Sequence, residues 1–241
     1  MRKAAALAAA FAAFAAFAAG EAGLAPFSGT APGAELPAGW FPIALPYGTH
    51  SEIAIAPDPG GSVLRIRSVH SFGSVAHRTS IDPAASPRLS WRWKVDRVVE
   101  GASLARKGGE DFAARVYVSY DYPEDLLSFG TRAKLAIART FYGFVPAAAI
   151  CYVWDNRHAP GTAAWSPYFD HVRVVVLESG NAKAGRWVDE ERDIEADFRA
   201  AFPGWKGAVP RVNGLIAGND TDQTGEEATA WFGDFHLAGR P

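Results

Sequence analysis

Short runs in which apolar and polar residues alternate constrain the fold of this chain more than any other feature. In the run 88–96, Leu89, Trp91, Trp93 and Val95 alternate with polar or charged residues. Successive side chains of a strand point to opposite faces, so this run predicts a strand with one buried face. Gly, Pro, Asn and Asp clusters separate further runs of this kind, which span 62–70, 111–121, 147–155, 171–179, 211–220 and 228–237.

Two segments instead carry apolar residues at helical spacing, Pro123–Gly143 and Asp193–Pro203. Many short strands with only two helices predict a mainly β fold, an antiparallel β-sandwich of the jelly-roll-like kind. It would carry one inserted amphipathic helix and one short helix. The inserted helix either packs on the sandwich or binds a membrane surface through its basic residues. Packing is favoured, because most helix stability comes from such contacts.

The N-terminal residues predict export. A basic head, Met1–Lys3, precedes an uncharged Ala-rich run and small residues suited to signal peptidase, which is typical of a secretory signal. We expect a signal peptide at 1–25, an N-terminal arm or linker at 26–39, and a single β-sandwich domain at 40–241. An uncleaved anchor is the alternative. The mature chain is expected to be periplasmic or secreted, without a transmembrane span, because no later run is apolar enough.

Charge and cysteine content argue against a nucleic-acid-binding protein and against a fold held by internal disulfides. The formal net charge is −2, which argues against a nucleic-acid partner, because such proteins present a basic face. Cys151 is the one cysteine, so the chain has no internal disulfide. Its apolar surroundings in the sequence predict a buried, inert thiol.

The acidic stretch "GNDTDQTGE", 218–226, is a candidate metal site. Asp220, Asp222 and Thr224 stand at alternate positions before a glycine, and oxygen ligands in this pattern suit a hard cation. With Glu226 they form the predicted site of a structural calcium ion. The glutamate that a helix-loop-helix calcium loop has at position twelve is replaced by Trp231, so the match is partial. A solvated turn is the alternative.

A strand that ends in Trp154, Asp155, Asn156 and Arg157 is a candidate ligand site. Apolar sugar faces stack on indole rings, and amide, carboxylate and guanidinium groups bind hydroxyls. Asp111 and Arg115, on the outward face of the run 111–121, complete the predicted ligand-binding set. The alternative is a core tryptophan capped by a polar turn.

Several motifs together resemble a known family. "WRWKVD", "GEDFAARVYV", "YVWD" and "DTDQTGEEATAWFGDF" occur in an order that resembles DUF3047, a family of exported bacterial proteins, from about Trp40 to Leu237. The resemblance implies one exported domain and supplies no catalytic residues. The late acidic turn and the ending "GDFHL" are more loosely similar to galactose-binding-like jelly-roll carbohydrate-binding modules. Those modules bind glycans without cleaving them, often with a structural calcium ion.

These features predict a non-catalytic protein that binds a glycan or cell-envelope polysaccharide, because no nucleophile, His–carboxylate pair or cofactor loop is recognisable. The first alternative is a hydrolase or lyase acting on polysaccharide, which needs two carboxylates facing each other about 5–9.5 Å apart. The candidates are Asp111, Asp155, Glu178, Asp220, Asp222 and Asp234. The second alternative is a structural envelope protein that uses the helix Pro123–Gly143 as its contact.

Overall fold

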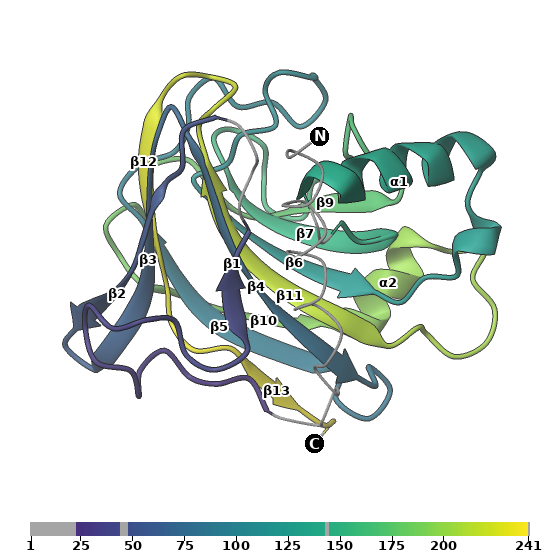
Figure 1. Ribbon diagram of the computed structural model, residues 1–241, viewed down its shortest axis with the longest axis horizontal. Coiled ribbons are helices and arrows are strands. Elements are labelled where there is room, and N and C mark those ends of the chain that lie inside the picture. Colours follow the sequence, from purple (N-terminus) through teal and green to yellow (C-terminus); the bar gives the residue numbers. More distant parts are fainter. Residues whose placement is uncertain (1–22, 44–47, 143–144, 241) are drawn as a thin grey trace, which may run out of the picture.

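The computed structural model describes residues 23–43, 48–142 and 145–240, and in them two β-sheets pack face to face (Figure 1). Sheet A has the order β1-β4-β11-β6-β7-β9-β8. Its strands are β1 (Trp40–Pro42), β4 (Phe72–Ile81), β6 (Ala114–Tyr120), β7 (Ala148–Asp155), β8 (Ala163–Trp165), β9 (Val172–Ser179) and β11 (Val212–Asp220). Sheet B has the order β10-β5-β12-β3-β2, and β13 also pairs with β5. Its strands are β2 (Glu52–Asp58), β3 (Gly61–Val69), β5 (Arg88–Val95), β10 (Val188–Asp193), β12 (Glu227–Phe232) and β13 (His236–Ala238).

The fold is the predicted jelly-roll-like β-sandwich, and its pairings are antiparallel except for β7 with β9. The strand predicted at 88–96 is β5, whose four apolar side chains are at most 3% exposed. They pack against the inner face of sheet A, where the ring centroids of Trp93 and Trp154 lie 5.9 Å apart. Burial of such large rings is the main favourable contribution to folding.

Sheet A is covered on both faces, which the alternating pattern did not predict. Every residue of β7 is buried, and so is every residue of β6 except the half-buried Tyr117. The chain between β5 and β6 lays Leu104 and Phe112 over the outer face of the sheet, against β7 and β9. Arg115 therefore points outward as predicted, yet it is only 6% exposed. Alternation indicates which face a side chain occupies, but not what covers that face.

The segment 26–39, predicted as an N-terminal arm or linker, is held against the sandwich by Phe27 and Ser28. Phe27 is fully buried, with its ring centroid 4.9 Å from Trp40 and 6.4 Å from Phe235. Ser28 donates from its backbone N–H and its hydroxyl to the Asp234 carboxylate, at 3.0 and 2.5 Å. A single apolar anchor in irregular chain has no periodicity, so the sequence carried no signal for it. Of the predicted signal peptide 1–25, residues 1–22 lie outside the described residues.

Within the described residues, two α-helices and a short 3₁₀ turn accompany the strands. They are η2 (Glu124–Leu126), α1 (Phe129–Tyr142) and α2 (Ile194–Ala201). The α1 helix begins later than predicted, because the Ser128 hydroxyl accepts the backbone N–H of Thr131 at 3.1 Å and so caps its start. Asp193 caps α2 in the same way through the N–H of Ala196, at 2.8 Å. None of the helices in these described segments is long and apolar enough to cross a bilayer.

Candidate functional site

The predicted sugar-stacking site at the end of β7 is wrong, because its aromatic plate lies in the core. Trp154 is 1% exposed, and its indole N–H donates to the carbonyl of Gly180 at 3.1 Å. Asn156 and Arg157 both donate to the carbonyl of Ala102, at 3.1 and 2.6 Å. These side chains hold the loop before β6 in place and leave no indole face for a ligand.

Asp155 is also structural in its immediate contacts. It is fully buried, and its Oδ2 accepts the backbone N–H groups of Arg157 and His158, at 2.9 and 2.6 Å. The same oxygen lies 2.9 Å from Nδ1 of His158. This His–carboxylate pair could not be predicted from the sequence, because its contact depends on the turn that follows β7.

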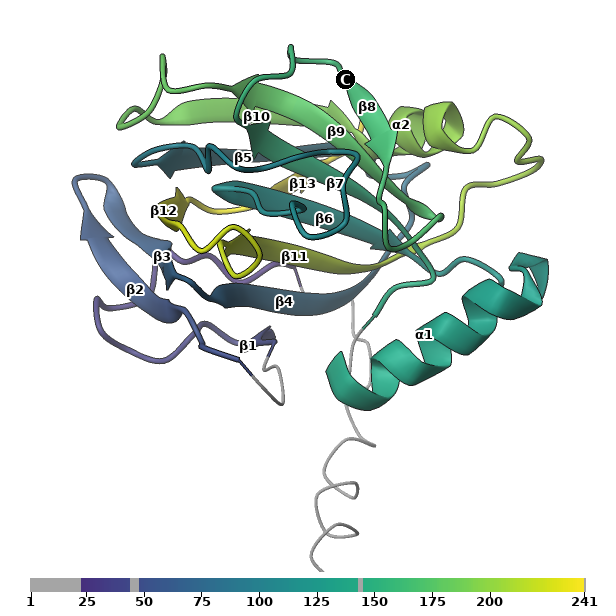
Figure 2. The same ribbon diagram turned by 90° about the horizontal axis from the view of Figure 1, so that it is seen from above.

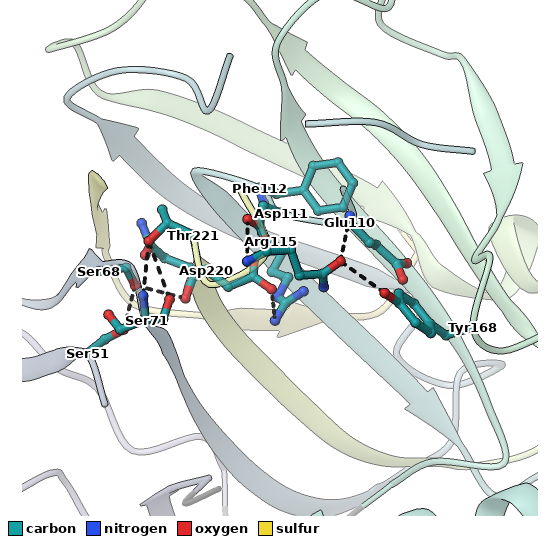
Figure 3. Close-up of polar contacts among 12 residues, drawn as sticks. Ser51, Ser68, Ser71, Glu110, Asp111, Phe112, Arg115, Tyr168, Asp220 and Thr221 are labelled. Atoms are coloured by element: carbon teal, nitrogen blue, oxygen red, sulfur yellow. Dashed lines mark hydrogen bonds and ion pairs between the residues drawn. The ribbon is translucent and has the colours of Figure 1, made fainter. Parts of the chain in front are cut away.

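The acidic stretch of the sequence forms a turn between two central strands. Here β11 ends at Asp220, the turn covers 221–226 with Gly225 at φ 71°, and β12 returns into the opposite sheet. The turn brings together a group that we call the acidic cluster, consisting of Glu110, Asp111, Arg115, Asp220 and Asp222, and Figure 3 shows the first four of these residues. Its three aspartates each place a carboxylate oxygen within 4.8 Å of the other two.

A buried ion pair anchors the acidic cluster to sheet A. Arg115 donates to Asp220 at 2.7 Å, and both side chains are almost fully buried. The second oxygen of Asp220 accepts the backbone N–H of Phe112 at 3.1 Å. Burial raises the pKa of Asp220, while Arg115 opposes that rise and the nearby Asp111 carboxylate adds to it. The rings of Phe72 and Tyr117 flank the guanidinium, at 5.3 and 5.5 Å from their centroids.

Asp111 ties the turn to the loop before β6. Its Oδ2 accepts three hydrogen bonds, from the backbone N–H of Gln223 at 3.1 Å and from the N–H and hydroxyl of Thr224 at 2.7 and 2.8 Å. Its Oδ1 is buried and has no hydrogen-bond partner among the described residues. Burial raises the pKa of Asp111, opposed by the bonds from Thr224. This carboxyl group can therefore hold a proton or bind a cation.

Glu110 is the member of the cluster that the sequence reasoning missed. It is 8% exposed, and its Oε2 accepts the hydroxyl of Ser166 at 3.0 Å. Burial raises its pKa, while Ser166 and Arg115 oppose the rise. The carbonyl oxygen of the Gln223 side chain accepts the N–H of Glu110 at 3.3 Å and the hydroxyl of Tyr168 at 3.1 Å. Glu110 therefore sits beside the turn that carries the exposed Asp222.

The structure does not bring the four residues of the predicted metal site together. Asp220 and Asp222 lie together, but Thr224 donates its hydroxyl to Asp111. Glu226 accepts the backbone N–H groups of Glu100 and Gly101, at 2.9 and 2.7 Å, and so fastens a different loop. Asp111 takes their place in the group of carboxylates that could hold a cation.

The other predicted carboxylates are scattered. Glu178 pairs with Lys183 at 2.6 Å, and Asp234 holds the N-terminal arm. A cavity of about 440 Å³ on the side of sheet B is lined partly by Asp234 and Glu190. Burial and the Glu178 carboxylate raise the pKa of Glu190 to about 7. The acidic cluster is the larger convergence of carboxylates, and it contains three of the six that the sequence singled out.

The fold and the cluster together define a jelly-roll-like β-sandwich with a buried acid group on the outer face of its larger sheet. The family model described as "Protein of unknown function (DUF3047)" matches residues 38–236, and the chain belongs to this family. No curated protein matches the chain.

Solved structures with a related architecture include three glucan-acting enzymes by name. The native endo-1,4-β-glucanase CelB2, a cellulase, is 12% identical, with a TM-score of 0.47 over 90% of this chain and 99% of that chain. The xyloglucanase domain of NopAA from Sinorhizobium fredii is 10% identical, with a TM-score of 0.42 over 86% and 100%. Endoglucanase Cel12A from Rhodothermus marinus is 8% identical, with a TM-score of 0.43 over 84% and 92%. Likeness at this level concerns the type of fold.

The prediction of a non-catalytic glycan-binding protein is wrong. Of the solved structures with a related architecture, several are named as endoglucanases or xyloglucanases and one as an adhesin domain. The indole proposed to stack on the glycan is buried in the core. The alternative drawn from the sequence, a polysaccharide-acting enzyme with carboxylates brought together by the fold, is better supported.

Proposed function

We propose that this protein hydrolyses a polysaccharide and that the acidic cluster carries the reaction. The observation that carries the proposal is one nearly buried carboxyl group with a raised pKa, Glu110, beside the turn 221–226, which carries the exposed carboxylate Asp222. Glycoside hydrolysis requires one protonated and one ionised carboxyl group, and different environments are what separate their roles. Glu110 would donate its proton to the leaving glycosidic oxygen, and Asp222 would supply the second carboxylate.

The remaining members of the cluster would position this pair. The Arg115–Asp220 ion pair and the three bonds to Asp111 hold the turn and the preceding loop together. Tyr168, which is 38% exposed, donates its hydroxyl to Gln223 and offers an aromatic ring at the same place. Sugars stack on such rings, so Tyr168 is the candidate contact for a sugar ring next to the carboxyl groups.

The test is release of reducing ends from a panel of soluble polysaccharides. We expect the full chain to cleave at least one of them and Asp222→Asn to lower kcat at least a hundredfold, because the ionised carboxylate is lost while the shape is kept. Asp189→Asn, at an exposed carboxylate of β10 outside the cluster, is the control and should retain activity. Activity that survives Asp222→Asn would contradict the assignment, and inactivity on every polymer would contradict the function.

A second candidate role for the same residues is a structural calcium site. Three carboxylate oxygens lie within 4.8 Å of one another, and Oδ1 of Asp111 has no partner among the described residues. Hard oxygen donors of this kind suit calcium, and an ion would relieve the repulsion among the aspartates. In this role Asp222 would be a ligand rather than a reacting carboxylate.

Thermal unfolding with EDTA and with millimolar calcium separates the two roles. For a calcium site, an ion at about 100 times its dissociation constant should stabilise the fold by about 2.7 kcal/mol. That would raise the melting temperature by roughly 5–10 °C at this chain length, and Asp222→Asn should abolish the rise. Glu226→Gln is the control and should keep it, because Glu226 binds the backbone of another loop. An unchanged melting temperature would rule out the calcium site and leave Asp222 free to react.

A further inference from the structure

The α1 helix has two apolar faces, and only one of them is covered. Thr131, Leu135 and Ala138 are buried, and Leu135 packs with Leu127 and Ala147 in a small cluster at the side of the sandwich. The opposite side of the helix is bare. Figure 2 shows α1 standing beside the strands rather than between the sheets, with one flank free.

The bare face carries the most exposed large apolar side chains among the described residues. Phe129 is 81% exposed, Ile137 is 62% exposed, and Leu126 in the preceding turn is 57% exposed. At about 100° per residue, Phe129 and Ile137 fall within an arc of about 80° on one side of the helix. Such side chains in water are unfavourable unless another surface covers them.

Basic residues border this apolar stripe on both sides. Arg132 lies about 60° to one side of Phe129 around the helix, and Lys134 lies about 60° beyond Ile137. Both are exposed, and neither forms an ion pair with another described residue. The helix contains three basic residues and no acidic residue, although the whole chain has a net charge of −2. Long basic side chains at the edges of an apolar stripe place their charges at the level of lipid headgroups.

We propose that the outer face of α1 binds the surface of an anionic lipid bilayer. The helix would lie in the interface, with Phe129, Ile137 and Leu126 among the acyl chains and with Arg132 and Lys134 against lipid phosphates. The charge pattern favours a bilayer over a second copy of this chain, because two copies would bring equal positive charges together. The stripe, with three large side chains on a helix about 21 Å long, is also small for the ~800 Å² per partner of a stable dimer.

The test is sedimentation of the full chain with phosphatidylglycerol–phosphatidylethanolamine vesicles and with phosphatidylcholine vesicles. We expect preferential binding to the anionic vesicles. Phe129→Ser/Ile137→Ser should weaken it more than tenfold, because two large apolar side chains no longer enter the bilayer. Arg132→Gln/Lys134→Gln should weaken it about 30-fold, from about 1 kcal/mol for each basic residue. Ala133→Ser/Ala136→Ser, on the same exposed side of the helix, is the matched control and should bind as the parent does.

A probe on the helix separates this binding from any contributed by the apolar run 4–19. Cys151 is buried and is the one cysteine, so Thr140→Cys gives one accessible thiol on the outer side of α1. The emission of a polarity-sensitive dye attached to this thiol should shift to shorter wavelength on anionic vesicles. The emission of the same dye attached at Ala182→Cys should not shift. Three outcomes would overturn the proposal: equal binding to both vesicle types, binding retained in Phe129→Ser/Ile137→Ser, or sedimentation without a shift at position 140. Self-association that this double variant abolishes, without vesicle binding, would assign the face to a second copy instead.

Discussion

Arg115→Met is expected to destabilise the protein by about 3–5 kcal/mol, because it leaves the buried Asp220 carboxylate without its cation. For a chain of this length the melting temperature should fall by roughly 10 °C. The loss should be larger at pH 8 than at pH 5. Without Arg115 the folded-state pKa of Asp220 rises further, so the proton that relieves the strain is present at low pH and is lost as pH rises through that pKa. Urea unfolding at the two pH values measures both effects.

The double variant Arg115→Met/Asp220→Asn shows whether the ion pair itself is responsible. The Asn carbonyl oxygen can still accept the N–H of Phe112, which now bonds to Asp220, and no charge is left buried. We expect this variant to recover most of the lost stability, because removing both charges avoids the desolvation penalty. A loss below 1 kcal/mol in Arg115→Met would contradict a stabilising ion pair, whereas no recovery in the double variant would mean that the guanidinium contributes mainly through packing on Phe72 and Tyr117.

Glu110→Gln is expected to lower kcat on a polysaccharide substrate at least a hundredfold, because the amide cannot protonate the leaving oxygen. The kcat on aryl glycosides with a good leaving group should fall far less, since departure of that group needs little protonation. The pH profile should change as well. In the parent, activity falls as pH rises through the pKa of Glu110, which burial holds above its ordinary value, and this alkaline limb should disappear in the variant.

Ser166→Ala supplies the matched control for that profile. Its hydroxyl donates to Glu110 and lowers the pKa of the carboxyl group. Removing it should move the alkaline limb to higher pH while leaving activity at low pH in place. A limb that stays where it is in both variants would show that another group donates the proton.

The fold could be predicted because its strands repeat a simple pattern. The alternation in β5 identified the buried face of sheet B, and helical spacing located α2 to within two residues at each end. The position of Phe27 could not be predicted, because its contacts with Trp40 and Phe235 depend on distant segments. The burial of Trp154 follows from the opposite sheet, which a strand pattern does not describe.

The candidate site could be predicted only in part, for a similar reason. Asp220, Asp222 and Asp111 were recognised as chemically interesting, but Asp111 is about 110 residues from the other two and meets them only because β11 lies beside β6. Glu110 gave no signal, because its raised pKa comes from burial beneath a loop rather than from its sequence neighbours. Thr224 and Glu226 fitted a local ligand pattern, yet their contacts lie with other loops.

The order of the strands has a consequence for when this chain can fold during synthesis. The late strand β11 lies between β4 and β6, and β12 lies between β3 and β5, so each sheet is completed from its middle by the segment 212–232. A ribosome-bound chain that has not yet released this segment has an open gap in both layers and no closed core. Pairings between such distant segments also form slowly. The closed sandwich therefore cannot form before the segment 212–232 is available, and a chain truncated before β11 would leave no stable partial product.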